Sequence, residues 1–216
     1  IYLPNIESEK ELKKVARYLY RINKHSLAIK CAVKETEEIV HKHMRMGIGV
    51  TGYLQATEEQ RSWLESCYIY LREYDRTYSR DAGYPASIKL TTVKPSGTLS
   101  LLAGVTPGAH PGYSEHYIRR IRMSADSELV NVCRNNGFGV EYVRNFDGTE
   151  DHSTVVVSFP CKFPKGTMFA GDMSAVDQLE VIKRLQAEWS DNSVSVTVYY
   201  RKEELDVIKA WLRENY

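Results

Sequence analysis

One run of the sequence combines residue types suited to holding a phosphate group: Val93-Lys94-Pro95-Ser96-Gly97-Thr98-Leu99-Ser100. β-Branched residues predict a strand over 87–93, and a short helix is expected directly after the turn. The unpaired N–H groups and the dipole at a helix N-terminus attract anions. Hydroxyl donors come from Ser96, Thr98 and Ser100, and Gly97 lets a ligand approach the backbone. From the residues alone, a simple helix start with no ligand remains the alternative.

A second glycine-rich run, Gly47-Ile48-Gly49-Val50-Thr51-Gly52, matches the Gly-x-Gly-x-x-Gly pattern of dinucleotide-binding loops. That pattern binds a nucleotide when it follows a strand and opens a helix. Here it follows a charged stretch with helical character, at 41–45. We therefore predict that these glycines allow close packing of the backbone against a neighbouring element.

The four cysteines are predicted to be reduced, structural thiols, because none belongs to a Cys-x-x-Cys pair and the chain is too long to need disulfides. They are Cys31, Cys67, Cys133 and Cys161. No metal site is predicted either. His41 and His43 lie two positions apart, which places them on different faces of a helix.

The first eighty residues are predicted to be mainly helical. Ser8 and Thr57 each begin a capping box, with Glu11 and Gln60 three positions later. Apolar residues follow both caps at helical spacing. A further helix is expected over 27–45.

Strands and helices alternate through the second half. Strands are predicted over 117–123, 153–159 and 193–199, and a final helix over 202–214. Ser124 and Ser174 are predicted to cap the helices between them. This alternation is typical of an α/β architecture with parallel strands, and we predict one domain over residues 1–216.

The composition indicates a globular protein of ordinary charge. Twenty-nine basic and 28 acidic residues leave a net charge of +1, so no strong field favours nucleic acid or a membrane surface. No apolar run is long enough to span a bilayer, and no secretory signal is recognisable at the N-terminus. A cytoplasmic location is predicted.

Several runs resemble the adenosylcobalamin-dependent branch of the ribonucleotide reductases, in particular its monomeric ribonucleoside-triphosphate type. The resemblance covers essentially the whole chain, and its motifs occur in the family's order. They are the runs at 45–52, 94–102, 104–108, 110–111, 117–123, 155–160 and 191–197.

The resemblance implies a ten-stranded α/β barrel, of which this chain would supply the second half and a helical N-terminal third. The partner would be the remaining half of the barrel. The cofactor would be adenosylcobalamin, and a thiyl radical would start the reduction of a ribonucleoside di- or triphosphate to a deoxyribonucleotide. The residues implied to bind the substrate's phosphates are Pro95, Ser96, Gly97, Thr98, Leu99 and Ser100.

The sequence also departs from the family. The Asn-x-Cys-x-Glu setting of the family's radical cysteine is absent, and none of the four cysteines matches a redox position. No catalytic residue is therefore predicted here. We expect an internal segment of a longer reductase, inactive by itself. The alternatives are a stand-alone module that binds a nucleotide or phosphate without catalysis, and a structural subunit that completes another chain's barrel.

Overall fold

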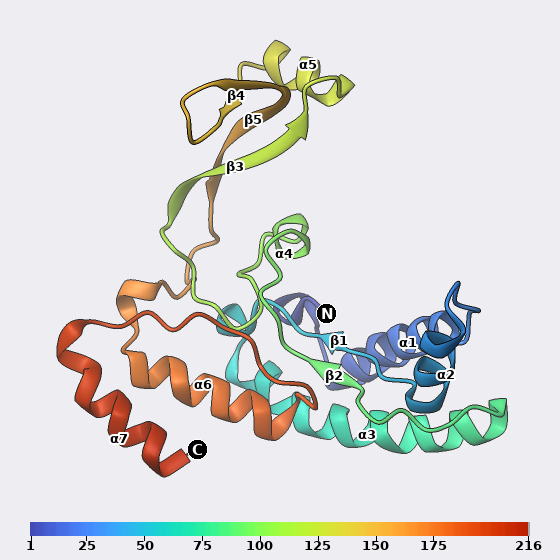
Figure 1. Ribbon diagram of the computed structural model, residues 1–216. Coiled ribbons are helices and arrows are strands. Elements are labelled where there is room, and N and C mark those ends of the chain that lie inside the picture. The colour runs from blue at the N-terminus through green and yellow to red at the C-terminus, as the bar shows by residue number, and fades with distance from the viewer. Residues whose placement is uncertain (216) are drawn as a thin grey trace. The chain divides into compact units, whose positions relative to one another are not determined.

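The computed structural model describes residues 1–215, and its backbone contacts divide the chain into two compact units (Figure 1). The first consists of residues 1–112 together with the chain from Gly166 onward, and the second is Tyr113–Lys165. Each unit has a hydrophobic core of its own. The sequence pattern did not indicate this division, because the second unit interrupts the first without a composition change or an evident linker.

Two long helices, α1 (Glu9–Leu27) and α3 (Glu58–Ala82), form the base of the first unit. Both predicted N-caps are confirmed. The Ser8 hydroxyl accepts a hydrogen bond from the Glu11 N–H at 3.2 Å, and Thr57 and Gln60 form a complete capping box. The Glu11 carboxylate differs in detail, since it accepts from the Glu7 N–H at 2.7 Å. These caps satisfy backbone donors that a helix start leaves unpaired.

The two helices contribute one apolar face each to the larger core. Leu12 and Ala16 of α1 and Leu64 and Leu71 of α3 have no solvent exposure. They recur at spacings of four and seven residues, which places them on one face of their helix. α3 ends as predicted at Gly83, whose φ of 72° is in the left-handed region.

The only sheet of the first unit, within the described residues, is a parallel pair of short strands, β1 (Ile48–Gly49) and β2 (Thr91–Thr92). The predicted strand over 87–93 is therefore shorter than expected, and residues 193–199 form no strand. Among the described residues, four α-helices complete this unit: α2 (Lys34–His43), α4 (Leu99–Leu102), α6 (Ala175–Glu188) and α7 (Leu205–Asn215).

The second unit is a three-stranded antiparallel sheet with one helix packed against it. The strand order is β3 (His116–Ser124), β5 (Glu150–Lys162) and β4 (Gly139–Arg144), and the helix is α5 (Glu128–Asn135). The prediction of parallel strands was wrong here. The run at 153–159 is not buried on both faces; its burial alternates.

Two helix caps were also predicted, and one of them was wrong. Ser124 belongs to β3, and the N-cap of α5 is Ser127, so the predicted cap was wrong by three positions. The cap at Ser174 is confirmed, because its hydroxyl accepts from the Asp177 N–H at 3.1 Å. The fold is thus mixed α/β, but the two sheets formed by residues 1–215 are small and do not close into a barrel. Across the same residues, no helix has the length and apolar character that crossing a membrane requires.

Candidate functional site

The loop predicted to bind phosphate follows β2 directly. Gly97 and Thr98 form a turn, and α4 begins at Leu99, directly after that turn as predicted. Thr98 is the N-cap residue, with φ −107° and ψ −55°, and its side chain makes no capping hydrogen bond. Pro95, Thr98 and Leu99 are exposed, while Ser96 and Gly97 are half-buried. The loop therefore presents a hydroxyl group at the surface without using it to cap the helix.

Ser100 has a different environment from the one predicted. It is fully buried, and its hydroxyl donates to the carbonyl oxygen of Ser96. The Ser100 N–H donates to the same oxygen at 3.2 Å, and the Ser100 carbonyl accepts from the Val105 N–H at 3.0 Å. The side chain thus stabilises the loop from inside, and its hydroxyl is already engaged.

The residues before the loop are held from two sides. On one side, the Ile48 N–H donates to the Leu90 carbonyl at 2.8 Å. On the other, the Trp189 indole donates to the Thr92 carbonyl at 3.3 Å, and the Ser195 N–H donates to the Val93 carbonyl at 3.0 Å. The loop therefore departs from a fixed point, although its first strand is only two residues long.

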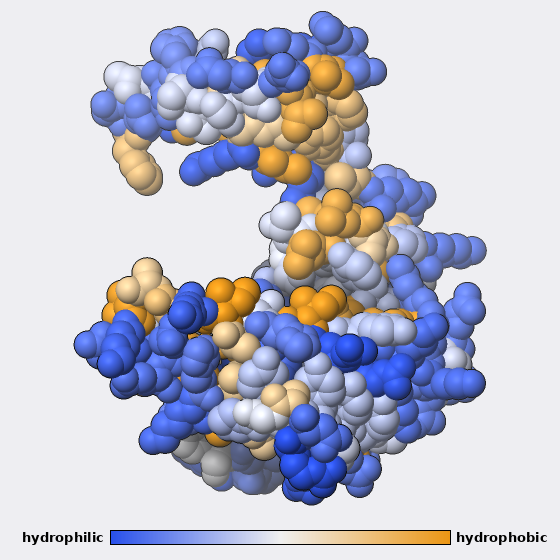
Figure 2. Space-filling view, turned by 90° about the vertical axis from the view of Figure 1, so that its right-hand side faces the viewer, coloured by the Kyte–Doolittle hydropathy of each residue, from blue (hydrophilic) through white to orange (hydrophobic). Residues whose placement is uncertain are grey.

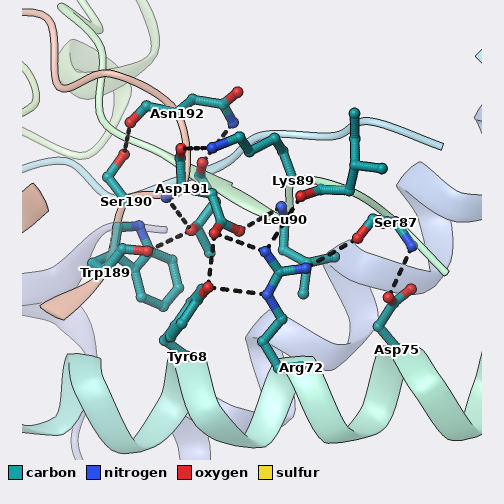
Figure 3. A network of polar contacts seen from close by, with 12 residues as sticks. Tyr68, Arg72, Asp75, Ser87, Lys89, Leu90, Trp189, Ser190, Asp191 and Asn192 are labelled. Atoms are coloured by element: carbon teal, nitrogen blue, oxygen red, sulfur yellow. Dashed lines mark hydrogen bonds and ion pairs between the residues drawn. The ribbon is translucent and has the colours of Figure 1, made fainter. Parts of the chain in front are cut away.

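A network centred on Asp191 holds the same segment in place (Figure 3). Tyr68 and Arg72 of α3 each donate to its Oδ1 at 2.7 Å, and the Leu90 N–H donates to its Oδ2 at 2.8 Å. Burial alone would raise the pKa of Asp191, but the hydrogen bonds from Tyr68, Leu90 and Arg72 outweigh it and hold that pKa below its usual value. The carboxylate thus stays charged in a largely buried position.

Asn192 extends this network to both strands. Its side-chain amide donates to the Thr91 carbonyl at 2.7 Å and to the Met46 carbonyl at 3.3 Å. The Thr91 hydroxyl in turn accepts from the Asp191 N–H at 3.0 Å. One segment after α6 therefore holds β2 beside the residues that lead into β1. The sequence alone did not indicate this role for Asp191 and Asn192, because their partner Thr91 lies about one hundred positions away.

The far end of the loop is fixed by the glycine-rich run at 47–52 and by Gly108. The Thr51 hydroxyl accepts from the Gly108 N–H at 2.7 Å and donates to the Thr106 carbonyl at 3.0 Å. Gly108 has φ +59°, and a Cβ there would lie 2.4 Å from the Lys94 carbonyl oxygen. No side chain fits at that distance, so Gly108 permits the two ends of the loop to meet.

The packing role predicted for the glycine-rich run is confirmed. A Cβ on Gly52 would lie 2.8 Å from Pro4 and 2.9 Å from Val105, and one on Gly47 would lie 3.0 Å from Thr92. Both glycines therefore allow close approaches that a larger residue would block. No helix starts directly after the run in the manner of a dinucleotide fold, because a single 3-10 turn and a loop precede α3.

His110 connects the end of the loop region to the segment after α6. Its Nδ1 lies 3.0 Å from the Pro107 carbonyl oxygen, and its Nε2 lies 2.9 Å from the Thr197 N–H. A carbonyl only accepts and an N–H only donates, so the ring carries its hydrogen on Nδ1 and accepts at Nε2. The imidazole thus links the Pro107 carbonyl to the backbone at Thr197.

The four cysteines are free thiols. Cys67 is fully buried in the larger core, and burial raises its pKa to about 12. Cys133 is buried in the core of the second unit, and Cys31 and Cys161 are half-buried. The environment of Cys67 suits a structural thiol, because a reactive cysteine needs a lowered pKa and access to solvent.

Apolar side chains are exposed next to the loop. Leu99 is 58% exposed and Leu102 is 81% exposed, and Figure 2 shows hydrophobic residues gathered on the surface over α4. The Leu99 carbonyl is held by the Tyr2 hydroxyl at 3.0 Å. An apolar surface beside the Thr98 hydroxyl, which does not cap its helix, is the combination expected where an organic phosphate or another part of a protein binds.

Three reductases represent the known proteins that are similar to this chain in sequence. The chain is 34% identical over 201 residues to a probable adenosylcobalamin-dependent ribonucleoside-triphosphate reductase of Dictyostelium discoideum, covering 91% of this chain and 26% of that protein. It is 36% identical to the Euglena gracilis enzyme (79% and 24% covered) and 31% identical to that of Lactobacillus acidophilus (83% and 28% covered). No protein-family model matches the chain.

Comparison of the fold with solved structures identifies a similar protein of the same kind. A crystal structure of a B12-dependent, class II ribonucleotide reductase superposes with a TM-score of 0.74 at 26% sequence identity, covering 97% of this chain and 33% of the other. The chain therefore spans about a quarter of the length of the curated relatives that it matches.

Proposed function

The chain belongs to the family of adenosylcobalamin-dependent ribonucleotide reductases, and on this premise we propose that its protein converts ribonucleotides to deoxyribonucleotides. In this proposal Pro95, Ser96, Gly97, Thr98, Leu99 and Ser100 form the loop that binds the substrate's phosphates. The carrying observation is sequence similarity to such reductases over 91% of the chain. The same similarity disfavours a stand-alone phosphate-binding module.

Within the loop, the proposed roles differ by residue. Thr98 is exposed and its hydroxyl does not cap α4, so we assign it a direct hydrogen bond to a phosphate oxygen. Ser96 is the second hydroxyl candidate. Ser100 holds the loop in shape through the Ser96 carbonyl. Pro95 lacks a backbone donor and restricts the turn that leads to Gly97. The substrate is a ribonucleoside di- or triphosphate, since a loop of this kind serves either.

The barrel is the architectural part of the proposal. β1 and β2 are parallel and lie at the core of the first unit, as strands of a barrel do. We propose that they belong to a ten-stranded α/β barrel whose remaining half comes from other residues of the protein. In this proposal, the network around Asp191 fixes the position of β2, and with it the start of the loop, relative to the other strands of that barrel.

Adenosylcobalamin is proposed as the cofactor of the whole protein, where it would supply the radical chemistry. The described residues do not fit a site for it. The pocket of about 430 Å³ between α1 and α3 is lined mainly by charged side chains, and the pocket of about 400 Å³ beside His41 lies among helix ends. Neither offers the broad apolar face that a corrin ring needs. We therefore assign this chain the binding and orientation of substrate, and no step that involves the cofactor.

The test is Thr98→Val in the full-length protein. A charge-assisted hydrogen bond is worth roughly 1.5–3 kcal/mol, so the dissociation constant of the nucleotide should rise about tenfold or more. Binding of the corresponding nucleoside, which has no phosphate, should not change. Thr36→Val, an exposed position on α2, is the matched control. If Thr98→Val leaves nucleotide binding unchanged, or weakens nucleotide and nucleoside equally, the loop is not the phosphate site.

A further inference from the structure

A charged groove lies between α1 and α3 and shares no residue with the phosphate loop. Its volume is about 430 Å³, and it is lined by Glu9, Lys10, Lys13, Lys14, Arg17 and Tyr70. Four of these six side chains are cationic and one is anionic. The whole chain has a net charge of only +1, so positive charge is concentrated at this place. We propose that this α1–α3 groove binds an oligophosphate anion, such as the phosphate chain of a nucleotide.

One of the four cations is already neutralised. Lys13 Nζ lies 2.6 Å from Glu9 Oε1, which also accepts a hydrogen bond from the Ser66 hydroxyl at 2.5 Å. These hydrogen bonds from Lys13 and Ser66 hold the pKa of Glu9 below its usual value. The Glu9 carboxylate is thus paired with Lys13, and it compensates the positive charge of the other three cations only in part. The remaining positive side chains of the groove are Lys10, Lys14 and Arg17.

These three cations have no carboxylate partner. None of the ion pairs formed among residues 1–215 includes Lys10, Lys14 or Arg17. Two other cations of these helices do have a carboxylate partner: Lys24 pairs with Asp75, and Arg72 pairs with Asp191. Unpaired like charges on one helix face repel one another, which costs stability. A bound anion would remove that repulsion.

The spacing of the three cations favours an elongated anion. Positions 10, 14 and 17 follow the i, i+4, i+7 pattern, so their side chains share one face of α1. Seven residues of helix extend over about 10 Å. A row of cations of that length complements a chain of phosphates better than a single small ion.

Tyr70 provides an apolar wall opposite this row. Its ring is half-buried and stacks on Tyr74 at 6.1 Å between centroids, with an angle of 21° between the planes. Tyr74 packs in turn on Tyr78 at 5.6 Å, and the Arg21 guanidinium lies 5.8 Å from the Tyr78 ring centre. The wall is thus held in place by its neighbours, and a flat aromatic face is suited to an organic ring attached to the phosphates.

The size of the groove favours a small molecule over a polymer. Its volume falls within the range of roughly 300–1,000 Å³ that small-molecule sites occupy. An acidic peptide would instead be expected to follow a longer surface. Inorganic oligophosphate and a nucleotide share the chemistry that Lys10, Lys14 and Arg17 recognise, and the experiment separates these two sources.

The test uses the 216-residue chain and isothermal titration with inorganic tripolyphosphate, ATP and adenosine. Tripolyphosphate and ATP should bind and adenosine should not. Lys14→Gln combined with Arg17→Gln should weaken binding of both anions at least tenfold. Lys34→Gln combined with Lys42→Gln removes the same charge from α2 and is the matched control. Tighter binding of ATP than of tripolyphosphate identifies a nucleotide, and equal binding identifies the inorganic anion.

Three results would overturn the proposal. One is an absence of tripolyphosphate binding by the wild-type chain at low salt. Another is an equal loss in the α2 control, which would indicate a general charge effect. The third is equally tight binding of polyglutamate, which would indicate a surface for acidic polymers. Thr98→Val should leave tripolyphosphate binding to the groove unchanged, which separates this inference from the phosphate-loop proposal. Circular dichroism of each variant verifies that the helices remain folded.

Discussion

Asp191 accepts a hydrogen bond from Arg72 at 2.7 Å, and this contact joins the segment after α6 to the middle of α3. The side chain of Asp191 is 9% exposed and that of Arg72 is 26% exposed. The pair is thus largely shielded from solvent. Such a pair fixes geometry more than it adds stability, but removing one member leaves a poorly solvated charge behind.

Asp191→Ala should therefore destabilise the chain by about 3 kcal/mol, because it leaves Arg72 and the Leu90 N–H without their acceptor. Urea denaturation followed by circular dichroism measures the change. Asp206→Ala, at an exposed position of α7, should cost less than about 0.5 kcal/mol and serves as the control. Equal losses of unfolding free energy in the two variants would show that the network in Figure 3 does not stabilise the chain more than an exposed ion pair does.

The same carboxylate predicts a pH dependence. The pKa of Asp191 is lowered in the folded chain, so its contribution to stability is fully present above the unfolded value of about 3.9. It is lost as the pH falls further, through the lower folded pKa. The difference in unfolding free energy between wild type and Asp191→Asn should thus be constant from pH 7 to pH 5 and should shrink below about pH 4. Denaturant titrations at stepped pH check this. A difference that grows on acidification would contradict the lowered pKa.

Two glycines next to the loop allow a matched comparison of steric cost. Gly104 and Gly108 both have positive φ, at 65° and 59°. A Cβ on Gly104 meets nothing within 4 Å, whereas one on Gly108 lies 2.4 Å from the Lys94 carbonyl oxygen. Gly104→Ala should cost about 1–2 kcal/mol for its backbone conformation alone. Gly108→Ala should cost clearly more, and in the full-length protein it should also weaken nucleotide binding because it displaces Lys94. Thermal denaturation and nucleotide titration measure the two effects, and equal costs would contradict the close approach.

The cysteines should separate into two kinetic classes. Cys67 and Cys133 are buried, and the pKa of Cys67 is raised to about 12, so a thiol reagent at pH 8 should modify them only as the chain opens. Cys31 and Cys161 are half-buried and should react faster. Mass spectrometry of partially labelled protein assigns the sites. Rapid labelling of all four would show that these thiols are not structural.

What the sequence allowed us to predict depended on how local each interaction is. The caps at Ser8, Thr57 and Ser174 were predicted correctly because each involves residues only three positions apart. The direction of β5 was not, because an apolar run does not indicate which strand it pairs with. The antiparallel neighbours of β5 are fixed by contacts across the whole second unit, which the periodicity of a single strand does not contain.

The candidate site shows the same distinction. The strand, turn and helix around Gly97 follow from local residue types, although both regular elements are shorter than predicted. The roles of Asp191 and His110 depend on partners 101 and 87 positions away, at Leu90 and Thr197. No spacing rule links such pairs. The buried position of Ser100, with its hydroxyl engaged, was equally invisible in the sequence.

The chain leaves the first unit and returns to it at nearly the same place. Gly112 donates to the Met168 carbonyl at 2.9 Å and accepts from the Ala170 N–H at 2.9 Å, so the first unit closes this junction with its own hydrogen bonds. In genetic terms, residues 113–165 form a cassette inserted between Gly112 and Gly166, and no residue of this cassette belongs to the hydrophobic core of the first unit. We therefore expect insertions and deletions within residues 113–165 to disturb the first unit less than changes of equal length inside that unit do.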